Sequence, residues 1–429
     1  MRRSPRLVSI VSANGLGTPP ASSEFTEPFL LERAAPEAND RADARPANAA
    51  DRNPPAKRIL LISNKVMHYR VSVYNYFHRR FASMGFEFCV VADSLQKQNR
   101  RRMEFEFHEI PFNFFKYRKT IRDLRPDAVI LFLHLKDWIT WPLIHWLRFQ
   151  RVPFACWTKG GNWDQGRSRL RYHLFNYFHG LSDALILYSH DCLRFVKPRF
   201  RGKAFVANNT INFDDFPLVH ETKEDIKKEF NIPFKKVVLF VGRMEAGGGR
   251  KRVDHLIDIF RDLTRRDIGL VLVGSGLSDE LKRRLNPLNT IYLGEVHDAR
   301  DLGIAKLFRM ADVCAIPGHV GLGLNQAFYW GLPVVTEEGD HPPEVGYLEP
   351  GRNGFMVPKD NLLAMKDRLL FLLDNDLLRA EFSKNARADI MSKASIDKMF
   401  EGFRDCVHFL TRLNGRTSCA EMPAAGTGR

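Results

Sequence analysis

A glycine-rich stretch, residues 317–336, carries the chain's clearest pattern for binding chemistry and reads PGHVGLGLNQAFYWGLPVVT. Gly318, Gly321 and Gly323 let the backbone approach a ligand closely, because glycine reaches conformations that other residues avoid. Residues 324–330 then read as a short helix, which a glycine and a proline end before the next strand. A loop that feeds a helix N-terminus presents free N–H groups and a positive dipole end, so the stretch suits an anion such as a diphosphate.

The glycine pattern alone does not identify the ligand. The GxG pieces at 274–276 and 321–323 both lack the third glycine of a dinucleotide fingerprint. The elements around the stretch must therefore narrow the function.

Apolar runs alternate with helical segments in the second half of the chain. The sequence predicts strands at 237–241, 269–273, 290–293, 313–316 and 333–336, and helices at 253–263, 361–375 and 394–413. Strands that alternate with helices indicate a parallel sheet with crossover helices.

The first half shows the same alternation. Its predicted strands lie at 59–63, 86–92, 103–110, 127–133, 153–158 and 184–188, and its helices include 70–84 and 138–148. Ligands of such sheets bind beyond the carboxyl ends of the strands. The residues to watch there are 64–70, His134 and 159–162.

Two βα series of this length predict an α/β protein with two Rossmann-like domains that face each other across a cleft. The predicted division is a disordered tail at 1–55, domains at 56–215 and 216–395, a helix at 396–413 that packs back on the first domain, and a disordered tail at 414–429. The first tail holds 8 of the 23 prolines and only two aromatic residues, a composition that cannot bury a core.

The net charge of +15 lies almost wholly in one part of the chain. Residues 56–220 hold 27 Lys and Arg against 13 Asp and Glu, whereas residues 221–429 hold 31 against 30. The first domain should therefore face nucleic acid, acidic lipid or a phosphorylated substrate, unless the charge is merely a solvated basic surface.

The six cysteines show no metal-binding spacing, which is typical of reduced, buried thiols in a cytosolic protein. The longest apolar run, 128–135, is much shorter than the roughly 18 residues that span a bilayer. Residues 112–124 mix aromatic and basic side chains, which favours a peripheral contact with an anionic membrane. A helix whose aromatics pack on its own sheet explains the same pattern.

The order of motifs in the second half resembles the retaining nucleotide-sugar glycosyltransferases of family 4, which have the GT-B fold. The pieces that carry the resemblance over 235–360 are VGR at 241–243, KRVD at 251–254, LVGSG at 272–276, LGEV at 293–296, ADV at 311–313, GLPVV at 331–335, PEV at 343–345 and GFMVP at 354–358. The first half agrees more loosely, through Tyr69, Arg70 and the segment 206–209.

The resemblance implies a catalytic role for Arg243 and Lys251. Two fixed cations at the donor diphosphate stabilise the negative charge that develops as the sugar–phosphate bond breaks. The other donor-binding residues that it implies are Gly242, Gly294, Glu295, Val296, Gly318, Gly321, Leu322, Gly323, Gln326 and Glu344. No metal or cofactor is expected, and the nucleotide-sugar enters as substrate; the literal DxD at 374–376 is interpreted as a helix end.

This chain departs from the family at the two glutamates that usually lie eight positions apart around the glycine-rich loop. Gly318 and Gln326 occupy those positions. Gln326 can still bind ribose hydroxyls, but Gly318 cannot replace a carboxylate. A similar PGxVGL loop resembles that of some bacterial polysaccharide enzymes, so we interpret a variant donor site. Our hypothesis is that Glu337, Glu338 or Glu344 supplies the missing carboxylate.

The first domain would bind the acceptor through His68, Tyr69, Arg70, Lys159 and Asn162. These side chains either bind an acceptor phosphate or cap loops. Retention of configuration in such enzymes is attributed to attack on the face from which the nucleotide leaves, which needs no protein base.

The predicted function is transfer of a hexose-type sugar from a UDP- or GDP-sugar to a saccharide acceptor, lipid-linked, in polysaccharide biosynthesis. The predicted location is the cytoplasm, peripheral at the inner face of the membrane. The main alternative is a catalytically silent GT-B scaffold or sugar-nucleotide sensor. A nucleic-acid binder is motivated by charge alone, without a recognised motif, and a GT-B epimerase or phosphorylase also stays open.

Overall fold

A computed structural model describes residues 56–96, 99, 101–161, 169–296 and 302–420. The predicted tail at 1–55 and most of the predicted C-terminal tail lie outside these residues. Within the described part, no helix is both long and apolar enough to cross a membrane.

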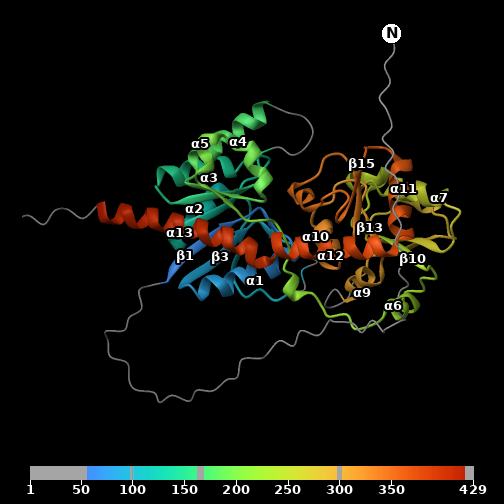
Figure 1. Cartoon of the computed structure of the whole chain (residues 1–429). Helices are drawn as coiled ribbons and strands as arrows, with labels where there is room; N and C mark the ends of the chain where they lie inside the picture. The colour runs from blue at the N-terminus through green and yellow to red at the C-terminus, as the bar shows by residue number, and fades with distance from the viewer. Residues whose placement is uncertain (1–55, 97–98, 100, 162–168, 297–301, 421–429) are drawn as a thin grey trace, which may run out of the picture. The chain divides into compact units, whose positions relative to one another are not determined.

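The first sheet is wholly parallel, as the alternating pattern predicts (Figure 1). Its strand order is β5-β3-β1-β6-β7-β8-β9. The strands are β1 (Lys57–Ile62), β3 (Phe86–Ala92), β5 (Glu106–Glu109), β6 (Ala128–Phe132), β7 (Phe154–Thr158), β8 (Ala184–Leu187) and β9 (Ala204–Val206), and a small separate pair is β2 (Lys65–Val66) with β4 (Ser94–Leu95).

Helices cover both faces of this sheet. One side carries α1 (His68–Ala82) and α13 (Ile396–Ala420), which packs on β8, β9 and α1. The other side carries α2 (Phe114–Leu124), α3 (Thr140–Phe149) and α4 (Arg169–Leu181), side by side in that order. The remaining short helices are η1 (His190–Phe195), α5 (Pro198–Arg201) and η2 (Phe213–Asp215).

The second sheet is also parallel, with the order β12-β11-β10-β13-β14-β15. Its strands are β10 (Lys236–Val241), β11 (Ile268–Val273), β12 (Thr290–Gly294), β13 (Val313–Ala315), β14 (Val334–Glu337) and β15 (Gly354–Val357). Its helices are α6 (Lys223–Glu229), η3 (Ala246–Lys251), α7 (Val253–Arg261), α8 (Asp279–Arg283), α9 (Leu302–Met310), α10 (Leu322–Tyr329), η4 (Pro343–Tyr347), α11 (Leu362–Asp374) and α12 (Asp376–Lys393).

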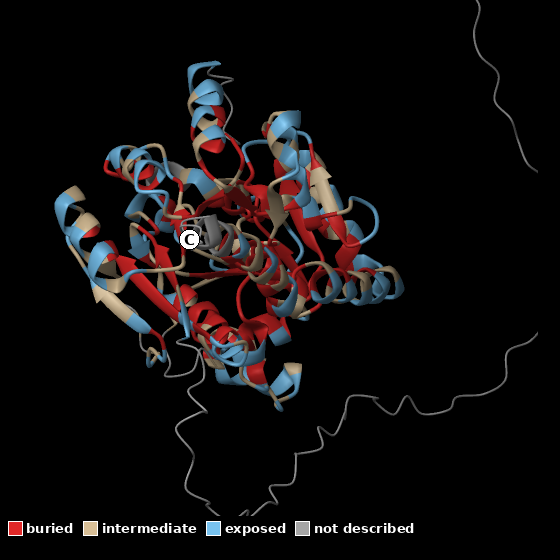
Figure 2. Ribbon diagram, turned by 90° about the vertical axis from the view of Figure 1, so that its left-hand side faces the viewer, coloured by how far each residue is buried: buried red, intermediate tan, exposed pale blue. Residues whose placement is uncertain are grey.

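Apolar residues on both faces explain why the strands are buried. Along β10, Val237 and Leu239 join one core cluster, whereas Val238 and Phe240 join another on the opposite face. Figure 2 shows the central strands as buried and the outer faces of the helices as exposed. A sheet packed on both faces reads as a continuous apolar run, which made these strands recognisable.

Several elements differ from the predicted pattern. The sequence predicted neither β9 nor β15, which are short edge strands, and it missed α12. In addition, α13 continues to Ala420, so the helix end predicted at residue 413 is too early. The first sheet spans strands between residues 57 and 206 and the second between 236 and 357, but the predicted domain limits stay a prediction.

Candidate active site

A cation-rich pocket of about 220 Å³ opens at the carboxyl end of β10. Arg243 and Glu245 follow β10, Arg250 and Lys251 belong to η3, and His319 follows β13; together these five residues line the pocket. The predicted pair Arg243 and Lys251 therefore meets in one pocket, where carboxyl ends of parallel strands place ligands. Their catalytic role stays a prediction.

Two glycines allow the pocket to form. A Cβ at Gly242 would lie 2.7 Å from Cε of Lys251, so glycine gives the lysine side chain room to cross this backbone. A Cβ at Gly318 would lie 2.2 Å from the Arg250 carbonyl oxygen. The loop that carries the two cations consequently packs directly on the glycine-rich stretch.

Backbone hydrogen bonds join these two segments. The Gly318 amide donates to the Lys251 carbonyl at 2.9 Å, and the His319 amide donates to the Arg250 carbonyl at 2.8 Å. A glutamate at position 318 would break this pairing. The glycine that departs from the family pattern is thus required by the local backbone of this chain.

The Lys251 ammonium points toward the start of the loop before α10. Its Nζ donates to the carbonyl oxygen of His319 at 3.2 Å. Burial lowers the pKa of Lys251 to about 8, and the charge of Arg250 adds to this lowering. A bound anion would place a negative charge beside the ammonium and would hold the lysine protonated.

His319 is a second pocket group with an altered pKa. Burial lowers the pKa of His319 to about 4, and the charges of Arg250, Lys251 and Lys159 contribute. The imidazole is therefore neutral at pH 7, and it can donate one hydrogen bond and accept another.

The glycine-rich loop leads into α10 as predicted. Gly321 has φ +54 and precedes the helix, Leu322 is its first residue, and Gly323 lies beside Lys251: a Cβ there would be 3.9 Å from Nζ. Gln326 is half-buried one turn later. The free N–H groups of the helix start are thus next to a pocket cation, an arrangement that suits a phosphate.

Three of the predicted donor-binding residues, Gly294, Glu295 and Val296, lie at the same edge of the sheet. Gly294 ends β12 with φ +69 and accepts a hydrogen bond from the Gly274 amide at 2.8 Å. Glu295 is exposed and Val296 half-buried just beyond it. One strand, β11, separates β12 from β10, so these residues extend the carboxyl edge beyond the pocket lining.

The three glutamates proposed to replace the missing carboxylate differ sharply in environment. Glu337 is 1% exposed and accepts hydrogen bonds from Arg252 and His255. Glu344 is buried and accepts a hydrogen bond from the Asn209 side chain. Glu338 is exposed. None of the three lines the pocket, whereas Glu245 does.

Sequence reasoning missed Glu245, Arg250 and His319 as pocket residues. Arg250 directly precedes Lys251, and His319 directly follows Gly318, so their sequence neighbours were recognised. Their convergence depends on the loop of residues 246–251 folding back on the glycine-rich stretch. That fold-back is tertiary information that the sequence pattern does not carry.

The predicted acceptor-side residues that the structure describes differ in burial and in their partners. His68 is exposed and bonds Gln96, and Tyr69 is half-buried. Arg70 is 6% exposed, donates to the Asn209 side chain at 2.6 Å and lies over the Trp157 ring. Arg70 is thus largely withdrawn from the surface, and its acceptor role stays a prediction.

Lys159 and Asn162 complete the predicted acceptor set. Lys159 is half-buried at the carboxyl end of β7, and its charge acts on His319 of the pocket. Asn162 lies outside the described residues. Lys159 is therefore the predicted acceptor-side residue with a link to the donor pocket.

Two groups among the described residues have metal-ligand types close together. The first, Cys89 with Glu106 and His108, contains a buried thiol whose pKa burial raises to about 12. The second, His255 with Glu337 and Asp360, already contains the guanidinium of Arg252, which bonds both carboxylates. A protonated thiol and an internal cation make both groups poor metal sites.

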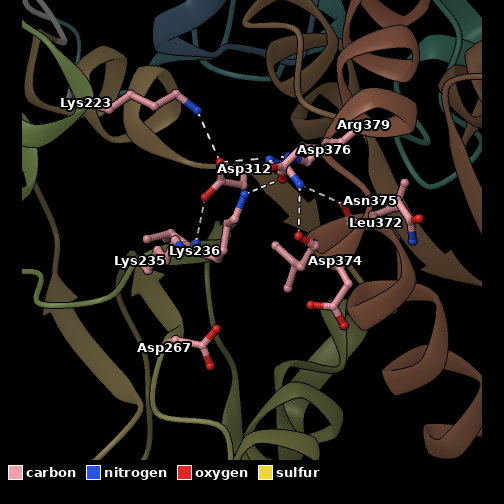
Figure 3. Close-up of polar contacts among 12 residues, drawn as sticks. Lys223, Lys235, Lys236, Asp267, Asp312, Leu372, Asp374, Asn375, Asp376 and Arg379 are labelled. Carbon is pink, nitrogen blue, oxygen red and sulfur yellow. Dashed lines mark hydrogen bonds and ion pairs between the residues drawn. The ribbon is translucent and has the colours of Figure 1, made fainter. Parts of the chain in front are cut away.

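The literal DxD motif is a helix junction, as interpreted from the sequence. Asp374 ends α11 and Asp376 begins α12. Figure 3 shows Asp376 with Lys236 and Arg379, which both donate to its carboxylate. Asp374 pairs with Arg265. These carboxylates serve the packing of the last helices on the second sheet.

Comparison with known proteins places residues 235–375 in the family model described as glycosyl transferases group 1. The chain is 24% identical over 203 residues to a poly(ribitol-phosphate) alpha-N-acetylglucosaminyltransferase of Staphylococcus aureus, covering 46% of this chain and 39% of the relative. It is 34% identical over 155 residues to a phosphatidyl-myo-inositol mannosyltransferase of Mycobacterium leprae, covering 34% of this chain and 40% of the relative. The chain thus matches less than half the length of these relatives.

Solved structures resemble a larger part of the chain. A glycosyltransferase from Rickettsia africae superposes with a TM-score of 0.65 at 14% identity, over 82% of this chain and 98% of the other. The Anabaena protein HepE in complex with UDP has a TM-score of 0.65 at 13% identity, over 82% and 99%. At these identities the likeness establishes the fold, which confirms the predicted pair of Rossmann-like sheets in a GT-B protein.

Proposed function

We propose that this GT-B chain, whose second sheet falls within the glycosyl transferases group 1 family model, transfers a hexose-type sugar from a nucleotide-sugar to a saccharide acceptor. The observation that carries the proposal is the pocket where Arg243, Arg250 and Lys251 converge beside the start of α10. Cations and free backbone amides together suit a nucleoside diphosphate better than a neutral ligand.

The chemistry follows from charge development. When the bond between the anomeric carbon and the phosphate oxygen breaks, negative charge grows on the terminal phosphate. Arg243 and Lys251 stabilise that charge more in the transition state than in the ground state. We propose retention of configuration, with the departing phosphate taking the proton of the acceptor hydroxyl, and no resident metal or cofactor.

The donor and acceptor are proposed more specifically. UDP- and GDP-sugars are the expected donors, and the UDP complex of the Anabaena HepE structure supports this class. The acceptor is a lipid-linked saccharide of polysaccharide synthesis, at the cytoplasmic face of a membrane. The excess of cations in residues 56–220 supports an anionic acceptor or surface.

A catalytically silent nucleotide-sugar binder is the second candidate. Position 318 cannot hold the first family carboxylate, because a Cβ there meets the Arg250 carbonyl. Glu245 is the carboxylate that lines the pocket instead. If Glu245 does not act near the donor sugar, the chain would bind donor without turnover.

Nucleotide release from a panel of UDP-, GDP- and ADP-sugars, with and without a membrane lipid extract, tests the proposal. Turnover with one donor, dependent on the extract, is expected. Arg243→Ala should lower kcat by on the order of 10² to 10³, the usual effect of removing one group that stabilises the transition state. Lys384→Ala, an exposed cation on α12, is the matched control and should retain full turnover.

The outcomes separate the two candidates. Nucleotide binding that Arg243→Ala weakens, without turnover in any mixture, would favour the silent binder. Absence of nucleotide binding would contradict both. A chelator added to the active mixture tests the metal expectation, because loss of turnover in that mixture would contradict it.

A further inference from the structure

Exposed aromatic and basic side chains gather at one end of α2, α3 and α4. The aromatic-basic rim consists of Phe115 and Lys116 at the start of α2, Trp138 just before α3, and Arg169, Leu170 and Tyr172 at the start of α4. Phe115, Trp138 and Leu170 are 72%, 70% and 69% exposed. Large apolar side chains this exposed, at neighbouring helix ends, mark an interaction surface.

The topology places these ends together. Each helix follows a strand of the same parallel sheet, so all three begin beyond the carboxyl ends of their strands. Arg122 of α2 lies over Trp146 of α3 at 5.8 Å. His145 of α3 hydrogen-bonds Tyr177 of α4 at 2.8 Å. The helices therefore run side by side in the same direction (Figure 1).

The charge around the rim is strongly positive. Asp137 is the one acidic residue in the sequence ranges 113–122, 134–139 and 169–173, which also contain seven Lys and Arg residues. The Asp137 carboxylate accepts a hydrogen bond from Asn64. Lys119 pairs with Asp123 on the next turn of α2. The rim therefore complements an anionic partner.

We propose that the aromatic-basic rim docks on an anionic lipid bilayer. Phe115, Trp138 and Leu170 would enter the headgroup and acyl boundary while the neighbouring cations meet lipid phosphates. A nucleic acid would use the cations but would leave the aliphatic Leu170 in water. The inference rests on the proposed function in one respect: the rim adjoins the strand edge that carries Lys159, so docking would bring a lipid-linked acceptor to the site.

Co-sedimentation of the full chain with vesicles tests the rim. We expect binding to phosphatidylcholine vesicles that contain phosphatidylglycerol, weak binding to phosphatidylcholine alone, and loss of binding as salt rises. Replacing Lys116 and Arg169 by Gln should weaken vesicle binding roughly 30-fold, from the usual contribution of a cation near an anionic surface.

The apolar contribution has its own variants. Phe115→Ser, Trp138→Ser and Leu170→Ser combined should abolish co-sedimentation. Phe149→Ser, at the opposite end of α3 and 81% exposed, and Leu377→Ser, 90% exposed on α12, are matched controls that should bind as the unaltered chain does. Vesicles should also shift the tryptophan emission to shorter wavelength, and Trp138→Phe should remove that shift.

The results separate this inference from the proposed function. Normal vesicle binding by the triple variant would overturn the proposal that the rim docks on a bilayer. An equal loss of vesicle binding in the Phe149→Ser control would overturn it as well. Turnover without vesicle binding would also overturn it and leave the transferase proposal standing. Vesicle binding without turnover of any donor would support the docking proposal and contradict the transferase proposal. Preference for nucleic acid over vesicles would replace the lipid with a different partner and would also overturn the inference.

Discussion

Lys251 combines a buried position with a charge that the proposed chemistry requires. Its pKa of about 8 reflects burial next to Arg250, without a carboxylate bonded to it among the described residues. In the free protein, Lys251 therefore changes its protonation state at a pH of about 8. At the residue scale, a bound donor diphosphate would neutralise the positive charge of the pocket and keep Lys251 protonated.

The lysine pKa predicts a pH effect on donor capture. Because kcat/KM reports the free enzyme, it should fall as pH rises through about 8, where Lys251 loses its proton. Lys251→Arg should remove this alkaline limb, because a guanidinium stays protonated, although its absolute rate is lower. Rates measured against pH for both proteins test this, and an unchanged limb in Lys251→Arg would assign the titration to another group.

Glu337 belongs to a buried network that supports the cation loop. The Glu337 carboxylate accepts hydrogen bonds from the Arg252 guanidinium and, at 3.0 Å, from the Asp360 amide. Arg252 directly follows Lys251 and has φ +55. These bonds hold a non-glycine residue in a left-handed conformation that is otherwise costly. We infer that Glu337 fixes the backbone behind the pocket and is not the missing sugar-side carboxylate.

Replacing Glu337 tests this structural role. Glu337→Gln should lower the free energy of unfolding by about 1 to 3 kcal/mol, the usual cost of leaving buried hydrogen-bonding groups unsatisfied. The adjacent Glu338→Gln is exposed and should change stability little. Urea unfolding measures both. A stable Glu337→Gln protein that binds donor normally but has lost turnover would return the carboxylate role to Glu337.

At the element scale, the strongly apolar strands and the glycine-rich loop could be predicted from the sequence. The runs at β1, β3, β6 and β10 are buried on both faces and leave little ambiguity. The short edge strands β9 and β15 and the polar helix α12 have no comparable pattern. The burial of Arg70 and of Glu344 could not be predicted either, because each side chain hydrogen-bonds Asn209, which is far away in the sequence.

The last helix shows how a distant segment completes a sheet. On α13, Phe403 is fully buried, 4.7 Å between ring centroids from Phe77 and 5.1 Å from Trp157. Phe403→Ala should therefore lower the free energy of unfolding by about 3 to 5 kcal/mol, as for other buried aromatic truncations. Leu377→Ala, on the exposed face of α12, is the control. Equal stability of the two variants would show that α13 does not complete the first core.

At the scale of the whole molecule, a chain of buried hydrogen bonds connects a helix beside the first sheet to elements beside the second sheet. Arg70 lies in the first turn of α1 beside the first sheet, Asn209 follows β9, and Glu344 lies in η4 after β14. The Asn209 side chain accepts from Arg70 and donates to Glu344. Asn325 of α10 donates to the Asn209 carbonyl at 3.1 Å, so the connection also reaches the helix behind the glycine-rich loop.

Asn209 is the member of this chain whose loss should affect both halves together. Asn209→Leu removes the acceptor of Arg70 and the donor to Glu344, and it leaves two buried charged groups without their shared partner. Leaving a buried hydrogen-bonding group unsatisfied typically costs about 1 to 3 kcal/mol. Since the variant keeps the side-chain size, the loss should come from polarity and not from packing. Hydrogen exchange should show faster opening at α1 and at η4 alike, with α11 unchanged as an internal reference. Opening confined to one of the two elements would mean that the chain of hydrogen bonds does not couple them.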